Sequence, residues 1–138
     1  MEYLVRKTYL DKIEKYVDKP IIKVLTGMRR VGKSTILKMV NEVTLKHIDN
    51  TNKVCINLES LNIISIREAE SLANYIQDKI KNKEGKLYFF FDEVQLVDGW
   101  ERVINALQVD YDCDIYLTGS NSTMLSGKLS TLIAGRYV

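Results

Sequence analysis

The stretch of sequence that most limits how this chain can fold is GMRRVGKS, residues 27 to 34. It matches the pattern G-x-x-x-x-G-K-[ST], whose glycines let the backbone turn closely around a polyphosphate while backbone N–H groups surround it. Such a loop has to join a strand to a helix, because the helix N-terminus contributes further N–H groups. An apolar run at 21–26 precedes the pattern, and apolar residues at helical spacing follow it. The sequence therefore predicts a strand, a phosphate-binding loop and a helix in succession.

Three more apolar runs have the composition of strands, and they lie at 53–58, 87–91 and 115–118. Segments with helical periodicity separate them. Two of these segments carry capping-box patterns at their predicted starts, Ser65 with Glu68 and Asp98 with Glu101. Strands that alternate with helices predict an α/β fold with a mainly parallel sheet and helices on both faces, a three-layer αβα sandwich.

The ends of the chain carry two further predicted helical segments. Apolar residues at helical spacing predict an amphipathic leading helix at about 2–17, and Pro20 then ends that element. Residues 124–133 suggest a last helical stretch, which Gly127 interrupts.

Length and composition narrow the class of protein. The 138 residues are enough for one domain, and no linker-like tract divides residues 1–138. A formal charge of +2 is too small for a field that would gather nucleic acid or anionic lipid. No apolar run approaches the roughly 18–20 residues that span a bilayer, and the N-terminus lacks a signal-peptide core, so we expect a cytoplasmic protein with no membrane insertion. Cys55 and Cys113 are interpreted as small buried hydrophobes rather than metal ligands.

Each polar residue of the phosphate-binding pattern has an expected role. Lys33 is expected between the β- and γ-phosphates, the Ser34 hydroxyl on Mg²⁺, and Thr35 near the α-phosphate. Arg29 and Arg30 are interpreted as facing solvent or pairing structurally, with catalysis as the less favoured alternative. The residues predicted to bind nucleotide are Gly27, Met28, Arg29, Arg30, Val31, Gly32, Lys33, Ser34 and Thr35.

Two carboxylates, Asp92 and Glu93, follow the apolar run at 87–91. They are expected at the carboxyl edge of a buried strand, where open parallel sheets bind their ligands. Asp92 is predicted to hold Mg²⁺, usually through water, and Glu93 to position and deprotonate the water that attacks the γ-phosphate. Gln95 is either a loop amide or a side chain that helps to orient this water.

A polar segment, TGSN at 118–121, ends the fourth predicted strand. Asn121 or Ser120 is predicted to sense the γ-phosphate. The alternative is a helix N-cap with a glycine turn, which accounts for the same residues.

These motifs favour ATP hydrolysis among the phosphate-handling functions. A nucleotide kinase needs no water-activating acid beside the metal acid, and the D-x-x-G and N-K-x-D motifs expected of a GTPase are absent. The leading hypothesis is therefore Mg²⁺-dependent binding and hydrolysis of ATP, coupled to a conformational change. A nucleotide-gated switch with little turnover is the alternative, and a small-molecule kinase is a weaker one.

Five motifs in chain order carry a resemblance to a known family: GMRRVGKS, FFFDEVQ, the tryptophan of VDGW, YLTGSN and GRYV. With these motifs the chain resembles a family of bacterial and archaeal AAA-type predicted ATPases. The resemblance implies the additional-strand, catalytic-glutamate division of P-loop NTPases. In that division the loop strand lies beside the strand that ends in TGSN, the DE strand comes next, and 53–58 forms the edge. It also makes Arg136 a candidate for the arginine that reaches the γ-phosphate, with an ordinary solvated arginine as the alternative.

The same resemblance bears on the rest of the protein. Members of that family are longer, so it implies an N-terminal part whose last strand is truncated and whose C-terminal domain is missing. We then expect weak or no turnover from this piece alone, and either self-association or contact with the missing domain. Whether the target is a protein or a nucleic acid does not follow from the sequence.

Overall fold

The computed structural model describes residues 10, 11, 13–18, 22–25 and 33–119. Its main elements are β1 (Lys23–Leu25), α2 (Lys33–Met39), β2 (Lys53–Asn57), α3 (Ala69–Ile80), β3 (Leu87–Asp92), α4 (Trp100–Asp110) and β4 (Cys113–Thr118). A π-helical segment, η1 (Val40–Thr44), continues α2, and short 3₁₀ turns lie at η2 (Asn50–Asn52), η3 (Leu61–Ile63) and η4 (Val94–Leu96). The predicted segment at 124–133 lies outside the described residues.

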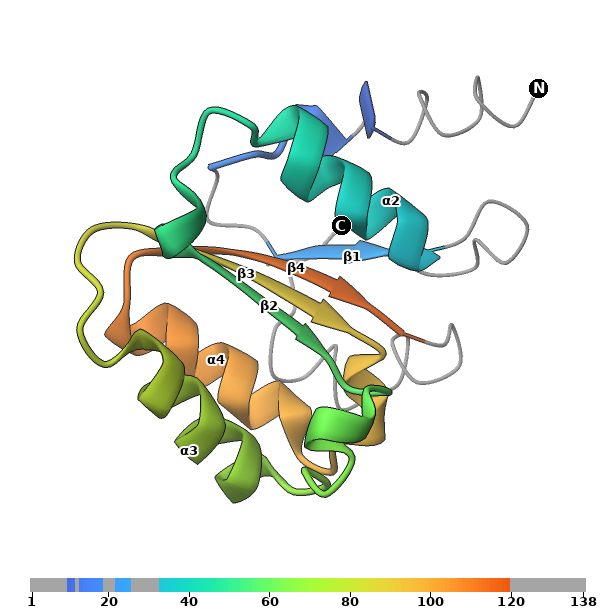
Figure 1. The fold of residues 1–138 in the computed structure, drawn as a ribbon, viewed down its shortest axis with the longest axis vertical. Coiled ribbons are helices and arrows are strands. Elements are labelled where there is room, and N and C mark those ends of the chain that lie inside the picture. Colours follow the sequence, from blue (N-terminus) through green and yellow to red (C-terminus); the bar gives the residue numbers. More distant parts are fainter. Residues whose placement is uncertain (1–9, 12, 19–21, 26–32, 120–138) are drawn as a thin grey trace.

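The four strands form one parallel sheet in the order β1-β4-β3-β2. Helix α2 lies on one face of this sheet, and α3 and α4 lie on the other (Figure 1). The α/β fold class and the order of the strands, including β2 at the edge, are therefore confirmed. No helix among the described residues is long and apolar enough to cross a bilayer.

Strand β3 lies at the centre of the fold and is buried along its whole length. Its side chains alternate between two apolar clusters, with Phe89 and Phe91 packing toward α3 and α4. Tyr88 and Phe90 belong to the cluster on the α2 face, where the Phe90 ring stacks on Tyr116 of β4 with centroids 5.1 Å apart. A strand covered on both faces needs apolar residues at every position, and the LYFFF run supplies them.

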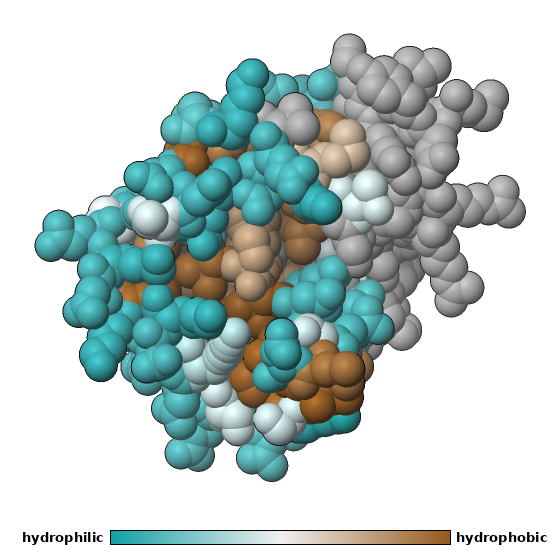
Figure 2. Space-filling view, in the orientation of Figure 1, coloured by the Kyte–Doolittle hydropathy of each residue, from teal (hydrophilic) through white to brown (hydrophobic). Residues whose placement is uncertain are grey.

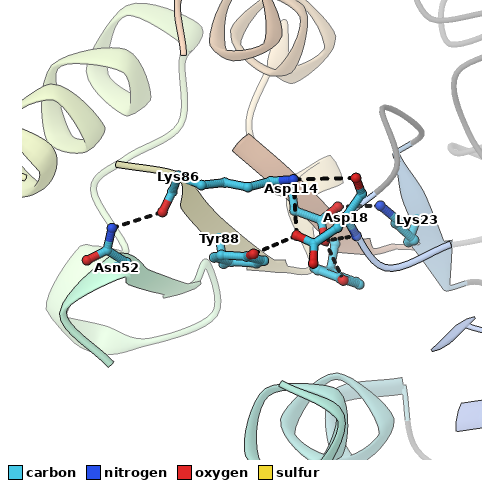
Figure 3. A network of polar contacts seen from close by, with 7 residues as sticks. Asp18, Lys23, Asn52, Lys86, Tyr88 and Asp114 are labelled. Carbon is cyan, nitrogen blue, oxygen red and sulfur yellow. Dashed lines mark hydrogen bonds and ion pairs between the residues drawn. The ribbon is translucent and has the colours of Figure 1, made fainter. Parts of the chain in front are cut away.

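A polar network lies on the α2 face of the sheet, near the amino ends of its strands (Figure 3). Lys23 and Asp114 form a fully buried ion pair between β1 and β4. Asp114 also accepts hydrogen bonds from the Tyr116 hydroxyl (2.7 Å) and the Asp18 backbone N–H (2.9 Å). Burial lowers the pKa of Lys23, although the hydrogen bond and the charge of Asp114 oppose that shift. The network joins the segment before β1 to the middle of the sheet.

The leading helix ends earlier than the predicted boundary at residue 17. Residues 10, 11, 13 and 14 are helical, and 15–18 form turns. Asp18 has a left-handed backbone (φ 64°) and donates its N–H to Asp114, so it does not continue a helix. Residues 2–9 of the predicted helix lie outside the described part of the chain.

The capping box predicted at Ser65 and Glu68 is wrong. Helix α3 begins at Ala69, and the Glu68 at its N-cap is extended and makes no side-chain cap. Glu68 instead forms a parallel β-bridge with Asp98, beside a 2.8 Å hydrogen bond from the Asp98 N–H to the Arg67 carbonyl. This pairing keeps residues 67–68 extended and delays the start of the helix.

The capping box predicted at Asp98 and Glu101 is wrong for the same reason, because Asp98 lies in that bridge. The N-cap of α4 is Gly99, with a left-handed backbone (φ 76°) and no side-chain cap. A Cβ at Gly99 would lie 3.3 Å from the Ala69 Cβ, so glycine also allows α3 and α4 to start close together.

The two cysteines differ from the buried interpretation. Cys55 is exposed because β2 is an edge strand, and Cys113 at the start of β4 is half-buried. Burial raises the pKa of the Cys113 thiol to about 11, and the nearby charges of Asp114 and Asp112 act in the same direction.

Candidate functional site

The candidate site lies where β3 and β4 end side by side. Phe91 pairs with Leu117 in the register, so the next residues along these strands, Asp92 and Thr118, are neighbours. Both lie on the α2 face, because they continue the alternation of Tyr88 and Phe90 on β3 and of Tyr116 on β4. Asp92 is 8% exposed and Thr118 is fully buried. The first predicted acid therefore occupies the carboxyl edge of a parallel sheet, as expected.

The Thr118 hydroxyl joins the two predicted acids. Its Oγ1 donates to Asp92 Oδ1 and accepts the backbone N–H of Glu93 at 2.8 Å. The direction of both bonds is fixed, because a backbone N–H can only donate and the hydroxyl proton is then left for the carboxylate. Asp92 Oδ2 has no hydrogen-bond partner among the described residues.

Glu93 has an unusual backbone conformation for a residue with a side chain. Its φ of 58° and ψ of 49° are left-handed, which costs an L-residue roughly 1–2 kcal/mol. The Thr118 bond to its N–H and a 3.2 Å bond from the Leu96 N–H to its carbonyl hold this conformation. A strained residue that the surrounding structure holds in place is a common feature of functional sites.

The amide of Gln95 contacts the Glu93 carboxylate. Gln95 Nε2 donates to Glu93 Oε2 at 2.7 Å, so the structure brings these two predicted residues together. The Gln95 Oε1 atom is buried and accepts no hydrogen bond from the described residues. This arrangement limits the rotation of the carboxylate.

The phosphate-binding pattern is described only in part. Helix α2 begins at Lys33 and includes Ser34, and Thr35 is half-buried in its first turn. The helix packs on the same face of the sheet that carries Asp92, through Leu37 and Val40. The predicted residues Gly27, Met28, Arg29, Arg30, Val31, Gly32, Ser120, Asn121 and Arg136 lie outside the described residues, as do the side chains of Lys33 and Ser34.

A groove separates α2 from the edge strand β2. It has a volume of about 270 Å³ and is lined by Leu37, Lys38, Asn41, Cys55, Ile56, Asn57, Phe90 and Asp92. Apolar side chains appear in the hollow between α2 and β2, with hydrophilic residues around them (Figure 2). Asp92 forms part of the groove wall, so this largely buried carboxylate borders a surface opening.

The oxygen ligands available at the end of β3 suit a metal ion that keeps most of its bound water. No cluster of three or more His, Cys, Asp or Glu side chains lies within metal-binding reach in the described part of the chain. Mg²⁺ is typically held by one or two carboxylates together with waters and substrate phosphates. A single buried carboxylate with one oxygen not hydrogen-bonded to the described residues fits that mode of binding.

Thr118, which contributes the hydroxyl between the two acids, is not among the residues predicted from the sequence. The prediction for TGSN gives the polar role to Ser120 or Asn121. One signal was present, because Thr118 is a β-branched polar residue that ends an otherwise apolar run at 115–118. Recognising its contact required knowledge of which strand lies beside β4.

A parallel sheet covered by helices on both faces, with acidic residues at the carboxyl end of β3, fits a P-loop NTPase fold. A family model described as "AAA domain" matches residues 19–138. The chain belongs to this AAA domain family, whose members are nucleotide-binding domains of the ATPase type.

Three uncharacterised proteins are similar in sequence. One, from Haemophilus influenzae, is 39% identical over 134 residues, which are 96% of this chain and 34% of that protein. Two from Methanocaldococcus jannaschii are 36% and 26% identical over 83% of this chain. The chain spans about a third of the length of the first relative and about a quarter of the other two.

Two solved structures share the fold. A DNA polymerase III gamma subunit-related protein from Thermotoga maritima superposes with a TM-score of 0.61 at 11% identity, over 94% of this chain and 44% of its own. Saccharomyces cerevisiae RIF2 gives a TM-score of 0.62 at 21% identity, over 95% of this chain and 52% of its own. At these identities the similarity concerns the fold alone.

Proposed function

We propose that this chain binds ATP with Mg²⁺ and hydrolyses it, and that turnover drives a conformational change in a larger protein. The observation that carries the proposal is the Asp92–Thr118–Glu93 arrangement at the end of β3. It lies on the sheet face covered by α2, and α2 begins with the Lys33 and Ser34 of the phosphate-binding pattern.

The polyphosphate is held by the loop and the start of α2. Backbone N–H groups from Gly27 to Gly32 would surround it, and the Lys33 ammonium would bind between the β- and γ-phosphates. Thr35 reaches the α-phosphate. The side chains of Met28, Arg29, Arg30 and Val31 are not required, because the loop binds phosphate through its backbone.

Ser34 and Asp92 would hold the magnesium ion, Asp92 through water. When bound, the ion neutralises negative charge on the phosphates. Thr118 keeps one carboxylate oxygen of Asp92 hydrogen-bonded, which leaves the other oxygen for this role.

Glu93 takes the proton of the attacking water and orients that water toward the γ-phosphate. The Gln95 amide holds the Glu93 carboxylate in one orientation. Asn121 is the candidate sensor of the γ-phosphate, and Arg136 is the candidate for stabilising negative charge in the transition state.

The binding step is tested by Lys33→Ala with Lys38→Ala as the matched control. Both variants remove one lysine from α2, but Lys38 is exposed and lies five residues further along the helix. We expect Lys33→Ala to weaken Mg²⁺-ATP binding at least about tenfold, as loss of a charge-assisted contact does. We expect Lys38→Ala to bind as the wild type does. Equal affinities for the two variants in calorimetry contradict the proposed site.

The chemical step is tested by separating the two acids. Glu93→Gln is expected to bind ATP and lose turnover, whereas Asp92→Asn is expected to lose the Mg²⁺ dependence of binding. Wild-type turnover in Glu93→Gln would assign the base to another residue.

A nucleotide-gated switch with little turnover is the second candidate. The Gln95 hydrogen bond favours it, because the Gln95 amide occupies Glu93 Oε2 and leaves that oxygen less available to an attacking water. Rapid-quench measurements separate the two functions. Multiple turnovers support the ATPase, and retention of unhydrolysed ATP after a single binding event supports the switch.

A further inference from the structure

We propose that Thr118 is a positioning residue that fixes Asp92 and Glu93 relative to each other. The inference rests on the proposed function, because it assigns those two acids to metal binding and water activation. It adds a residue of β4 that acts through the acids and touches no reacting atom.

The Thr118 hydroxyl lies at the buried end of β4, beside the end of β3. Thr118 is fully buried, and its Oγ1 is the only described group that hydrogen-bonds to the side chain of Asp92. The bond runs between neighbouring strands, from the end of β4 to the end of β3. It therefore sets the rotation of the carboxylate by means of the sheet itself.

The backbone conformation of Glu93 depends on the same hydroxyl. The left-handed conformation at this residue determines the direction in which its side chain leaves the strand. The Thr118 hydroxyl accepts the Glu93 N–H at 2.8 Å, so the group that orients Asp92 also holds this conformation. Loss of one hydroxyl releases both acids at once.

The Thr118 hydroxyl uses its only proton at the site of the two acids. Its single proton goes to Asp92, and it accepts the N–H of Glu93. A threonine that only filled space at this position could be replaced by valine without consequence for the acids. The structure assigns it one specific bond to each of them.

The test compares Thr118→Val, which keeps the shape, with Thr118→Ser, which keeps the hydroxyl, in the complete protein. Tyr116→Phe is the matched control, because it removes another fully buried hydroxyl from β4. The Tyr116 hydroxyl donates to Asp114 and hydrogen-bonds to neither Asp92 nor Glu93. Thr118→Ala serves if the valine variant does not fold.

Two readouts are measured for each variant. The first is the Mg²⁺ concentration that gives half-maximal tightening of ADP binding, which does not depend on turnover. The second is the pair of constants kcat and KM for ATP hydrolysis, each determined separately. For Thr118→Val we expect the half-maximal Mg²⁺ concentration to rise several-fold and kcat to fall about 10- to 100-fold, with little change in KM.

Thr118→Ser is expected to stay within about threefold of the wild type in both readouts, and Tyr116→Phe to match the wild type. A second check is a double-mutant cycle, in which Thr118→Val adds little to the loss already caused by Glu93→Gln. If Thr118→Val and Tyr116→Phe give the same Mg²⁺ dependence and the same kcat, the positioning role is wrong while the ATPase proposal stands. If the wild type shows no Mg²⁺-dependent nucleotide binding, the proposed function fails and this inference fails with it.

Discussion

Removal of the Asp114 carboxylate is expected to be among the most destabilising single changes in this domain. In Asp114→Ala, the buried Lys23 ammonium loses its ion-pair partner, and the Tyr116 hydroxyl and the Asp18 N–H lose their acceptor. Breaking a buried pair by removal of one partner typically costs about 3–5 kcal/mol. Domains of this kind have total stabilities of roughly 5–15 kcal/mol, so the loss is a large fraction of the whole.

Burial lowers the pKa of Lys23, and the hydrogen bond and the charge of Asp114 oppose that shift. Loss of the Asp114 carboxylate therefore leaves the desolvation of the ammonium with less compensation. A loss of 3–5 kcal/mol corresponds to a fall in Tm of roughly 10–20 °C for a domain of this size.

Variants of Lys23, alone and together with Asp114, test the coupling of this buried pair. Lys23→Met leaves Asp114 with two hydrogen-bond donors, so we expect a smaller loss of about 1–3 kcal/mol. The double variant Lys23→Met with Asp114→Asn removes both charges, and we expect it to lie within about 2 kcal/mol of the wild type.

Urea unfolding followed by circular dichroism gives these free energies. The fluorescence of Trp100, the single tryptophan and a buried one, gives an independent probe. A loss below about 1 kcal/mol for Asp114→Ala, or a double variant as destabilised as Asp114→Ala, would refute the interpretation of a tightly coupled buried pair.

Three further expectations concern a tight backbone position, a thiol and an arginine. Gly99→Ala should destabilise the fold by about 1–2 kcal/mol, and by more than Gly85→Ala. Both glycines have positive φ, but a Cβ at Gly99 would lie 3.3 Å from the Ala69 Cβ, whereas a Cβ at Gly85 would make an ordinary 3.6 Å contact with Asn52 Nδ2. The pKa of the Cys113 thiol is raised from 9.0 to about 11 in the folded chain. Between pH 9 and 11 the unfolded chain therefore loses this proton while the folded chain keeps it, so the free energy of unfolding falls as the pH rises through that range. Cys113→Ser should make this fall shallower in thermal melts taken across that range. Arg136→Ala should lower kcat of the complete protein at least about tenfold with nucleotide affinity retained, and unchanged turnover would eliminate Arg136 as the catalytic arginine.

The sequence was sufficient to predict the strands, their parallel arrangement and the two acids at the end of β3. Each of these features depends on a local pattern, such as the uninterrupted apolar run of β3 and the acids directly after it. The order of the strands came from resemblance to a family, because periodicity alone does not say which strands are neighbours.

Features that join distant segments were missed. Lys23 lies inside an apolar run, and its partner Asp114 is 91 residues away, so no local pattern connects them. The starts of α3 and α4 were misplaced because Glu68 and Asp98, which each resemble capping residues, pair with one another. Thr118 was overlooked for the same physical reason, since its role depends on the strand beside it.

The left-handed backbone at Glu93 bears on how this domain tolerates mutation. Glycine would adopt the same conformation without steric cost, so stability alone favours glycine at position 93 over an acid. If Glu93 is the base, the domain keeps a less stable residue there in return for chemistry. Variants selected only for heat resistance or expression would then drift toward well-folded chains without turnover, and a screen of this domain has to select for nucleotide hydrolysis together with stability.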